Sequence, residues 1–142
     1  FFESIGWALF LIVIMIRTPE FLMFTKDERL LQQVVLAVGA GIYEEFVFRV
    51  ILITGFAYVL GLILKWGNIG KNIGSVFLAA ALFSIFHFAG PYGEDPTWYL
   101  FFIRIIAGIF LGTIYIFRGF GIAAYTHTIY DLFVLVKFTT SN

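Results

Sequence analysis

The sequence predicts an all-α, multi-spanning transmembrane helical bundle, and its composition is the first reason. Of the 142 residues, 61% are hydrophobic, 20% are aromatic and only 13% are charged, whereas soluble domains are about 45–50% apolar and about 25% charged. A soluble domain of this length could not bury so much apolar surface in one core. The apolar residues also gather into about five long runs without the alternation of barrel strands, which indicates helices.

The first apolar run covers residues 1–16 and is expected to be a membrane span that ends before Arg17 and Pro19. It lacks a basic leading segment and a small-residue cleavage site, so we do not expect a signal peptide. Because the sequence begins with Phe1 and not with Met, we expect it to be truncated at its N-terminus. A loop is expected over residues 17–29.

The second apolar run, residues 30–64, is too long for a simple span. As one continuous helix of 35 residues it would measure about 52 Å, well beyond the hydrocarbon core of about 30 Å. We therefore expect this run to be strongly tilted, to protrude into water, or to bend or break near Gly39, Gly41 or Gly55.

Three further helical runs are expected over residues 73–88, 98–117 and 122–138. The segments between them, 65–72, 89–96 and 118–121, are rich in Gly, Pro and Asn, which are typical of loops and turns. The sequence has no internal repeat and no linker. We therefore expect one integral-membrane domain over residues 1–142, with the motif-bearing core at 30–138.

Charge and cysteine content exclude several classes of function. The formal net charge is zero and there is no basic run, so no nucleic-acid partner is expected, because such proteins cluster Lys and Arg on one surface. The absence of cysteine excludes disulfides, thiol nucleophiles and Cys-based metal sites.

Several ionisable residues lie inside the apolar runs, where each charge costs roughly 2.5–3.5 kcal/mol by insertion scales. They are Glu44, Glu45, Arg49, His87, Arg104, His127 and Asp131. Residues four apart share a helix face, which pairs Glu45 with Arg49 and His127 with Asp131. Glu44 points about 100° away from Glu45, so we expect it to face a polar cavity.

Each of these residues alone has a structural interpretation. The Glu45–Arg49 pair could join helices, His87 could be a helix–helix hydrogen-bonding residue, and His127 with Asp131 could be an orienting pair. Arg104 is expected to neutralise an acid or to extend toward the interface. Together, however, acids and histidines on three separate runs are the components of a hydrolytic site.

Three motifs occur in order along these runs: EEFVFR at 44–49 fits EExxxR, FSIFH at 83–87 fits FxxxH, and HTIYD at 127–131 fits Hxxx(N/D). In this the chain resembles the CAAX protease and bacteriocin-processing (CPBP) family, the intramembrane glutamate proteases related to the type II CAAX prenyl endopeptidase. The resemblance covers about residues 30–138. One departure is Asp131, where the prenyl-protease branch has Asn.

The resemblance implies a metal-free intramembrane endopeptidase without a cofactor. Glu44 would be the general base that activates water, assisted by His87, while His127 and Asp131 would stabilise the oxyanion. Glu45 and Arg49 would support the helix and the local field. Because an ionised Asp cannot donate a hydrogen bond, we expect Asp131 to orient His127 so that the imidazole donates.

The resemblance also implies a peptide or membrane-protein substrate within the lipid bilayer. A prenylated CaaX tail and a pheromone or bacteriocin precursor are both compatible with the chain. Its small size and short loops favour a bacterial cytoplasmic membrane over the ER membrane.

Other functions stay open at this point. Glu44, His87 and His127 match a two-His, one-carboxylate zinc set, which would make the chain a zinc-dependent intramembrane hydrolase, although it has no HExxH motif. Chains of Glu, His and Asp also form proton relays, so a proton-coupled transporter is an alternative, although inverted repeats are absent. An intramembrane chaperone or a catalytically silent scaffold would have the same sequence features.

Overall fold

The computed structural model describes residues 1–15, 30–89 and 95–140. Within these ranges every regular element is a helix, which confirms the all-α prediction. The elements are α1 (Phe2–Met15), α2 (Leu30–Glu45), the π-helix η2 (Phe46–Ile53), α3 (Thr54–Ile63), α4 (Asn68–Phe86), α5 (Trp98–Arg118) and α6 (Phe120–Thr140). The predicted loop at 17–29 and most of the one at 89–96 lie outside the described residues.

The described helices are apolar enough to form a membrane bundle. Three stretches are long and apolar enough to cross a bilayer, namely Gln32–Ile63, Asn68–Phe86 and Trp98–Arg118, and two shorter apolar helices cover Phe2–Val13 and Phe120–Val136. Large apolar side chains such as Phe77, Phe102 and Val136 are more than half exposed. Such a surface suits contact with lipid tails rather than with water.

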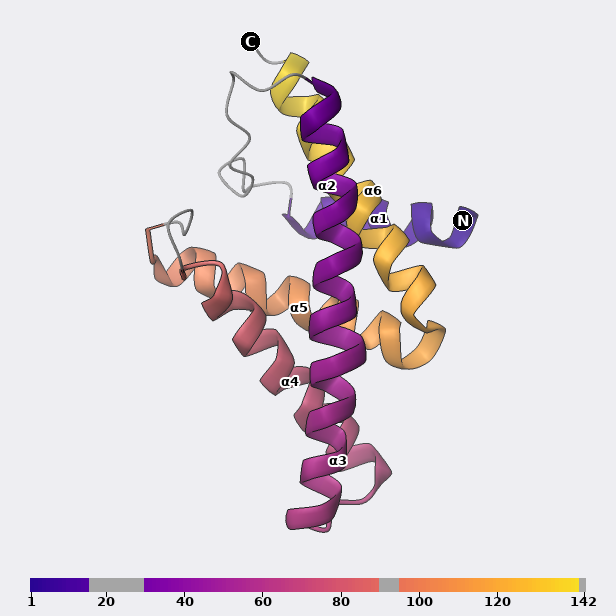
Figure 1. Ribbon diagram of the computed structural model, residues 1–142, viewed down its shortest axis with the longest axis vertical. Coiled ribbons are helices and arrows are strands. Elements are labelled where there is room, and N and C mark those ends of the chain that lie inside the picture. The colour runs from indigo at the N-terminus through magenta and orange to yellow at the C-terminus, as the bar shows by residue number, and fades with distance from the viewer. Residues whose placement is uncertain (16–29, 90–94, 141–142) are drawn as a thin grey trace.

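The long second run stays helical from residue 30 to residue 63, so among the alternatives expected for it a break near Gly39, Gly41 or Gly55 is excluded. Figure 1 shows α2, η2 and α3 as one continuous column along the long axis of the molecule. The irregularity is instead a change to π-type hydrogen bonding over η2. A break at membrane depth would leave backbone groups without partners at several kcal/mol each, whereas a helical glycine costs only about 1 kcal/mol.

Gly41 brings α2 close to α6, which runs beside it in Figure 1. A Cβ atom at Gly41 would lie 2.7 Å from Oγ1 and 3.2 Å from Cα of Thr128. Small residues allow this kind of close backbone approach between membrane helices. The contact sits one turn before Glu45 and directly after His127, so it sets the distance between the two helices at the polar cluster.

A second close contact positions the end of α4. A Cβ atom at Gly108 of α5 would lie 2.9 Å from the Cβ of Ala80 in α4, and the Ser84 hydroxyl donates a 2.9 Å hydrogen bond to the carbonyl of Phe101.

Between α5 and α6 the chain reverses at Gly119, whose φ of 84° favours glycine. The predicted turn between the last two runs is thereby confirmed.

We expect Gly41→Ala to lower the thermal unfolding midpoint in detergent, because the added methyl group collides with Thr128 and overpacking costs about 1–3 kcal/mol. Gly39→Ala is the matched control, since nothing lies within 4 Å of its added Cβ, and it should be neutral or slightly stabilising. Equal midpoints for the two variants would show that α2 and α6 are not in close contact at Gly41.

Candidate active site

The two adjacent carboxylates end α2, and Arg49 lies in the π-helix that follows. Short π-helical stretches occur frequently at functional sites. Arg49 Nε lies 3.0 Å from Oε2 of Glu45, and both side chains are almost completely buried. The ion pair expected from the spacing of Glu45 and Arg49 is therefore present.

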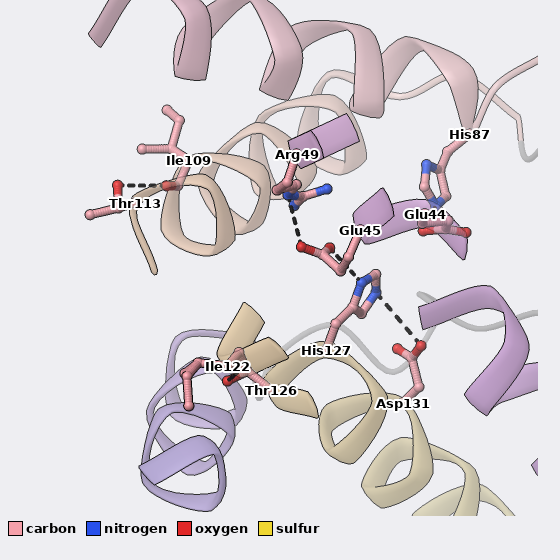
Figure 2. A network of polar contacts seen from close by, with 10 residues as sticks. All are labelled: Glu44, Glu45, Arg49, His87, Ile109, Thr113, Ile122, Thr126, His127 and Asp131. Carbon is pink, nitrogen blue, oxygen red and sulfur yellow. Dashed lines mark hydrogen bonds and ion pairs between the residues drawn. The ribbon is translucent and has the colours of Figure 1, made fainter. Parts of the chain in front are cut away.

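Glu45 also contacts His127, and this contact was not foreseen from the sequence. The Nδ1 atom of His127 lies 2.8 Å from Oε1 of Glu45 in a buried hydrogen bond between residues 82 positions apart. Figure 2 shows Glu45 between Arg49 on one side and His127 on the other. One carboxylate thus joins the end of α2, the π-helix and α6.

Asp131 is a more distant neighbour of His127 than expected. Its Oδ2 atom lies 3.6 Å from Nε2 of His127, which is beyond ordinary hydrogen-bond length. The hydrogen bond that fixes the imidazole ring comes from Glu45 instead. Asp131 is buried on the opposite side of the ring, so His127 lies between two carboxylates.

His87 directly follows α4, and its ring has a fixed tautomer. Nδ1 lies 2.8 Å from the carbonyl oxygen of Phe83, and because a carbonyl can only accept, the proton is on Nδ1. Nε2 then faces Oε2 of Glu44 at 3.9 Å. The side chains of His87 and Glu44 keep 22% and 21% of their surface exposed, so both are accessible, in contrast to Glu45.

Phe83 separates the two histidines and contacts both. Its ring centroid lies 4.5 Å from that of His87 and 6.2 Å from that of His127, and the Arg49 guanidinium carbon lies 5.0 Å from the centroid. In the sequence, Phe83 stood out only as the first residue of the FxxxH motif. The aromatic residue at the first position of this motif was the one signal in the sequence that could have indicated a ring in contact with the histidines.

Arg104 does not extend to the interface, so that part of the expectation is wrong. Its side chain is completely buried in α5, and its guanidinium carbon lies 4.9 Å from the ring centroid of Phe88, the residue after His87. A cation over an aromatic face is favourable in a desolvated position. Arg104 therefore belongs to the packing around His87.

The side chains of the cluster are not arranged as a metal site. Among the described residues, no group of three His, Cys, Asp or Glu side chains is placed to hold one metal ion. The zinc set considered from the sequence, Glu44, His87 and His127, would have to rearrange before it could act as a ligand set.

The fold and the site define a multi-spanning membrane protein with a cluster of ionisable side chains inside its helical bundle. The family model described as type II CAAX prenyl endopeptidase Rce1-like matches residues 26–133, a span that contains all three motifs. The chain belongs to this family, which confirms the resemblance drawn from the motifs. Comparisons with curated proteins and with solved structures found no match.

Membership in this family makes the chain an integral membrane protein and a CAAX-type intramembrane protease, with a peptide or protein as its substrate. The cluster of Glu44, Glu45, His87, His127 and Asp131 lies within the matched span. Its residues are therefore the candidates for the catalytic roles.

We expect Glu45→Ala to lower the unfolding midpoint strongly, because it leaves buried Arg49 without its carboxylate and removes the hydrogen-bond partner of His127. Loss of one partner of a buried pair costs about 3–5 kcal/mol. The measurement is thermal unfolding in detergent micelles, together with the yield of folded protein.

Glu44→Ala is the matched control for this measurement, since Glu44 is partly exposed and faces His87 rather than Arg49. Its midpoint should stay close to that of the wild type. If Glu45→Ala proves as stable as Glu44→Ala, Glu45 does not hold the cluster together.

Proposed function

We propose that this chain is a metal-free intramembrane endopeptidase in which Glu44 activates the attacking water. The observation that carries the proposal is the pair formed by Oε2 of Glu44 and Nε2 of His87, 3.9 Å apart and each about one-fifth exposed. It lies beside buried carboxylates and a buried histidine inside a membrane bundle. Paired acid and imidazole groups in reach of water are suited to general-base catalysis.

The first step follows from the positions of these two groups. A water molecule between Glu44 and Nε2 of His87 is within reach of both, and one bridging water is sufficient for general-base catalysis. Glu44 takes one proton as the water oxygen bonds to the carbonyl carbon of the peptide. His87 accepts a hydrogen bond from the other water hydrogen, because its own proton is held on Nδ1 by Phe83.

The second step needs a donor for the negative oxygen that forms on the substrate. His127 supplies it through Nε2–H as an imidazolium, with its Nδ1–H held by Glu45. Such a preorganised donor contributes about 3–4 kcal/mol to barrier lowering. Glu44 finally returns its proton to the leaving amine as the C–N bond breaks.

The two adjacent glutamates have different roles in this mechanism because their surroundings differ. Glu45 has no exposed side-chain surface and is occupied by Arg49 and His127, so it is a supporting residue with Arg49. Glu44 keeps 21% of its side chain exposed and can meet a substrate. Asp131 lies 3.6 Å from Nε2 of His127 and helps to position the imidazole ring.

We infer a substrate that presents its peptide bond from the bilayer. The description of the matching family favours a prenylated CaaX tail, and a pheromone or bacteriocin precursor is the other candidate. The membrane that we propose is the bacterial cytoplasmic membrane, because the chain has short loops.

We expect Glu44→Gln to lower peptide turnover by roughly a hundredfold or more, because the amide keeps the size of the side chain but cannot act as a base. Turnover should also survive strong chelation, and the purified protein should contain no stoichiometric metal. The measurement is cleavage of a fluorogenic prenylated peptide in detergent or proteoliposomes, with Glu3→Gln as the control for loss of an acid elsewhere.

Activity that disappears with a chelator and returns only with zinc would contradict this mechanism and favour the zinc alternative. Full activity of Glu44→Gln would remove Glu44 from the reaction. Cleavage of an unprenylated precursor but not of the prenylated peptide would change the substrate class and leave the mechanism intact.

We also expect the two histidines to differ on substitution. His87→Ala should lower kcat with little change in the unfolding midpoint, because the His87 side chain is about one-fifth exposed and directly follows α4. His127→Ala should lower both, because it removes a buried hydrogen bond to Glu45 at a cost of about 1–3 kcal/mol. Equal loss of stability in the two variants would contradict the assigned roles.

A further inference from the structure

A cavity of about 770 Å³ opens between η2, α3, the start of α4 and the end of α5, away from the catalytic cluster. Its wall is mostly apolar and includes Val50, Ile53, Ile116 and Phe120. Lys71 at its mouth and His87 lie sixteen positions apart on α4 and its cap, which corresponds to about 24 Å along the helix. Neither Glu44 nor His87 lines the cavity, so it is distinct from that pair.

The charged side chain and two of the polar ones lie at one end of the cavity, whereas Thr54 and Tyr115, whose hydroxyls hydrogen-bond to each other, lie farther along the wall. Lys71 and Asn72 come from the first turns of α4, and Tyr58 comes from α3. Val50 lies eight residues before Tyr58 on the same continuous helix, so the apolar wall extends about 12 Å inward from the polar end. The cavity therefore has a charged mouth and a mostly apolar interior.

The polar end lies at the edge of the membrane. The turn between α3 and α4 carries Lys65 and Trp66, both exposed, and Trp with Lys is typical of the membrane–water interface. The Lys71 alkyl chain packs across α3, where a Cβ atom at Gly61 would lie 3.5 Å from its Cδ. Lysine commonly buries its stem in this way while its ammonium stays at the polar boundary.

Within the described part of the chain, no carboxylate forms an ion pair with Lys71. Arg118, at the same end of the bundle, forms an ion pair with Glu3, whereas Lys71 has no ion-pair partner among the described residues. None of the described residues that line the cavity is acidic. A half-buried ammonium at the mouth of an apolar cavity is complementary to an anion attached to a hydrocarbon chain.

We propose that this cavity binds a phospholipid with an anionic headgroup. The headgroup phosphate lies at Lys71, Asn72 and Tyr58, and one acyl chain extends along the wall toward Val50. Basic pockets between membrane helices are known to select anionic lipids. The site would hold such a lipid against η2, the helix that carries Arg49.

The test is native mass spectrometry of the whole chain in detergent with equal amounts of phosphatidylglycerol and phosphatidylcholine. Wild type should retain phosphatidylglycerol preferentially. Lys71→Gln should lower that preference about fivefold, the order expected for one lysine near an anionic headgroup. Lys65→Gln is the matched control, because Lys65 lies at the same end and does not line the cavity, and it should keep the preference.

A second pair of variants tests the acyl-chain part of the site. Ala57→Phe fills the cavity and should lower retention of phosphatidylglycerol, whereas Val59→Phe, at an exposed position of α3 outside the cavity, should not. Excess glycerol 3-phosphate should fail to displace the lipid, because the chain contributes to binding.

Three results would overturn the proposal. They are equal retention of the two lipids by wild type, equal behaviour of Lys71→Gln and Lys65→Gln, and complete displacement by glycerol 3-phosphate. The last would show a site for the phosphate group alone. All these readouts are binding measurements, so they do not depend on the proposed protease mechanism.

Discussion

The buried contacts of Glu45 are the interaction on which the rest of the site depends. A charge taken out of water costs several kcal/mol unless a well-placed partner compensates it, and this bundle buries Arg49, His127 and Asp131 inside apolar helices. Glu45 meets Arg49 with one oxygen and His127 with the other. Through these two contacts a single carboxylate fixes the end of α2, the π-helix and α6 relative to one another.

The close contact of α2 with α6 makes this arrangement possible. A Cβ atom at Gly41 would collide with Thr128, so the two helices approach here only because residue 41 is glycine. One turn later the adjacent glutamates point about 100° apart. Glu45 turns into the interior, and Glu44 faces His87 with part of its side chain exposed. Two residues of the same type thereby acquire a structural role and the catalytic role that we propose.

Much of the fold and part of the candidate site could be predicted from the sequence. Helices follow from the length of the apolar runs, and local pairs follow from a spacing of four residues. The apolar runs predicted the helices, the four-residue spacing predicted the Glu45–Arg49 pair, and three ordered motifs indicated the family. The contact of Glu45 with His127 could not be predicted, since it joins positions 82 residues apart and depends on how two helices cross. The π-helix and the burial of Arg104 were also missed, because neither hydrogen-bond register nor tertiary burial is present in an apolar pattern.

The most direct test of this account is a structure of the whole chain bound to a phosphinate peptide, whose two phosphorus-bound oxygens stand for the attacking water and the substrate oxyanion. We expect one oxygen within hydrogen-bond distance of Glu44 and His87 and the other within that distance of Nε2 of His127. Glu45 should keep the ion pair with Arg49 and the hydrogen bond with His127 that it makes without the ligand. A phosphinate bound to Glu45, or one that makes no contact with Glu44, would contradict the division of roles between the two glutamates.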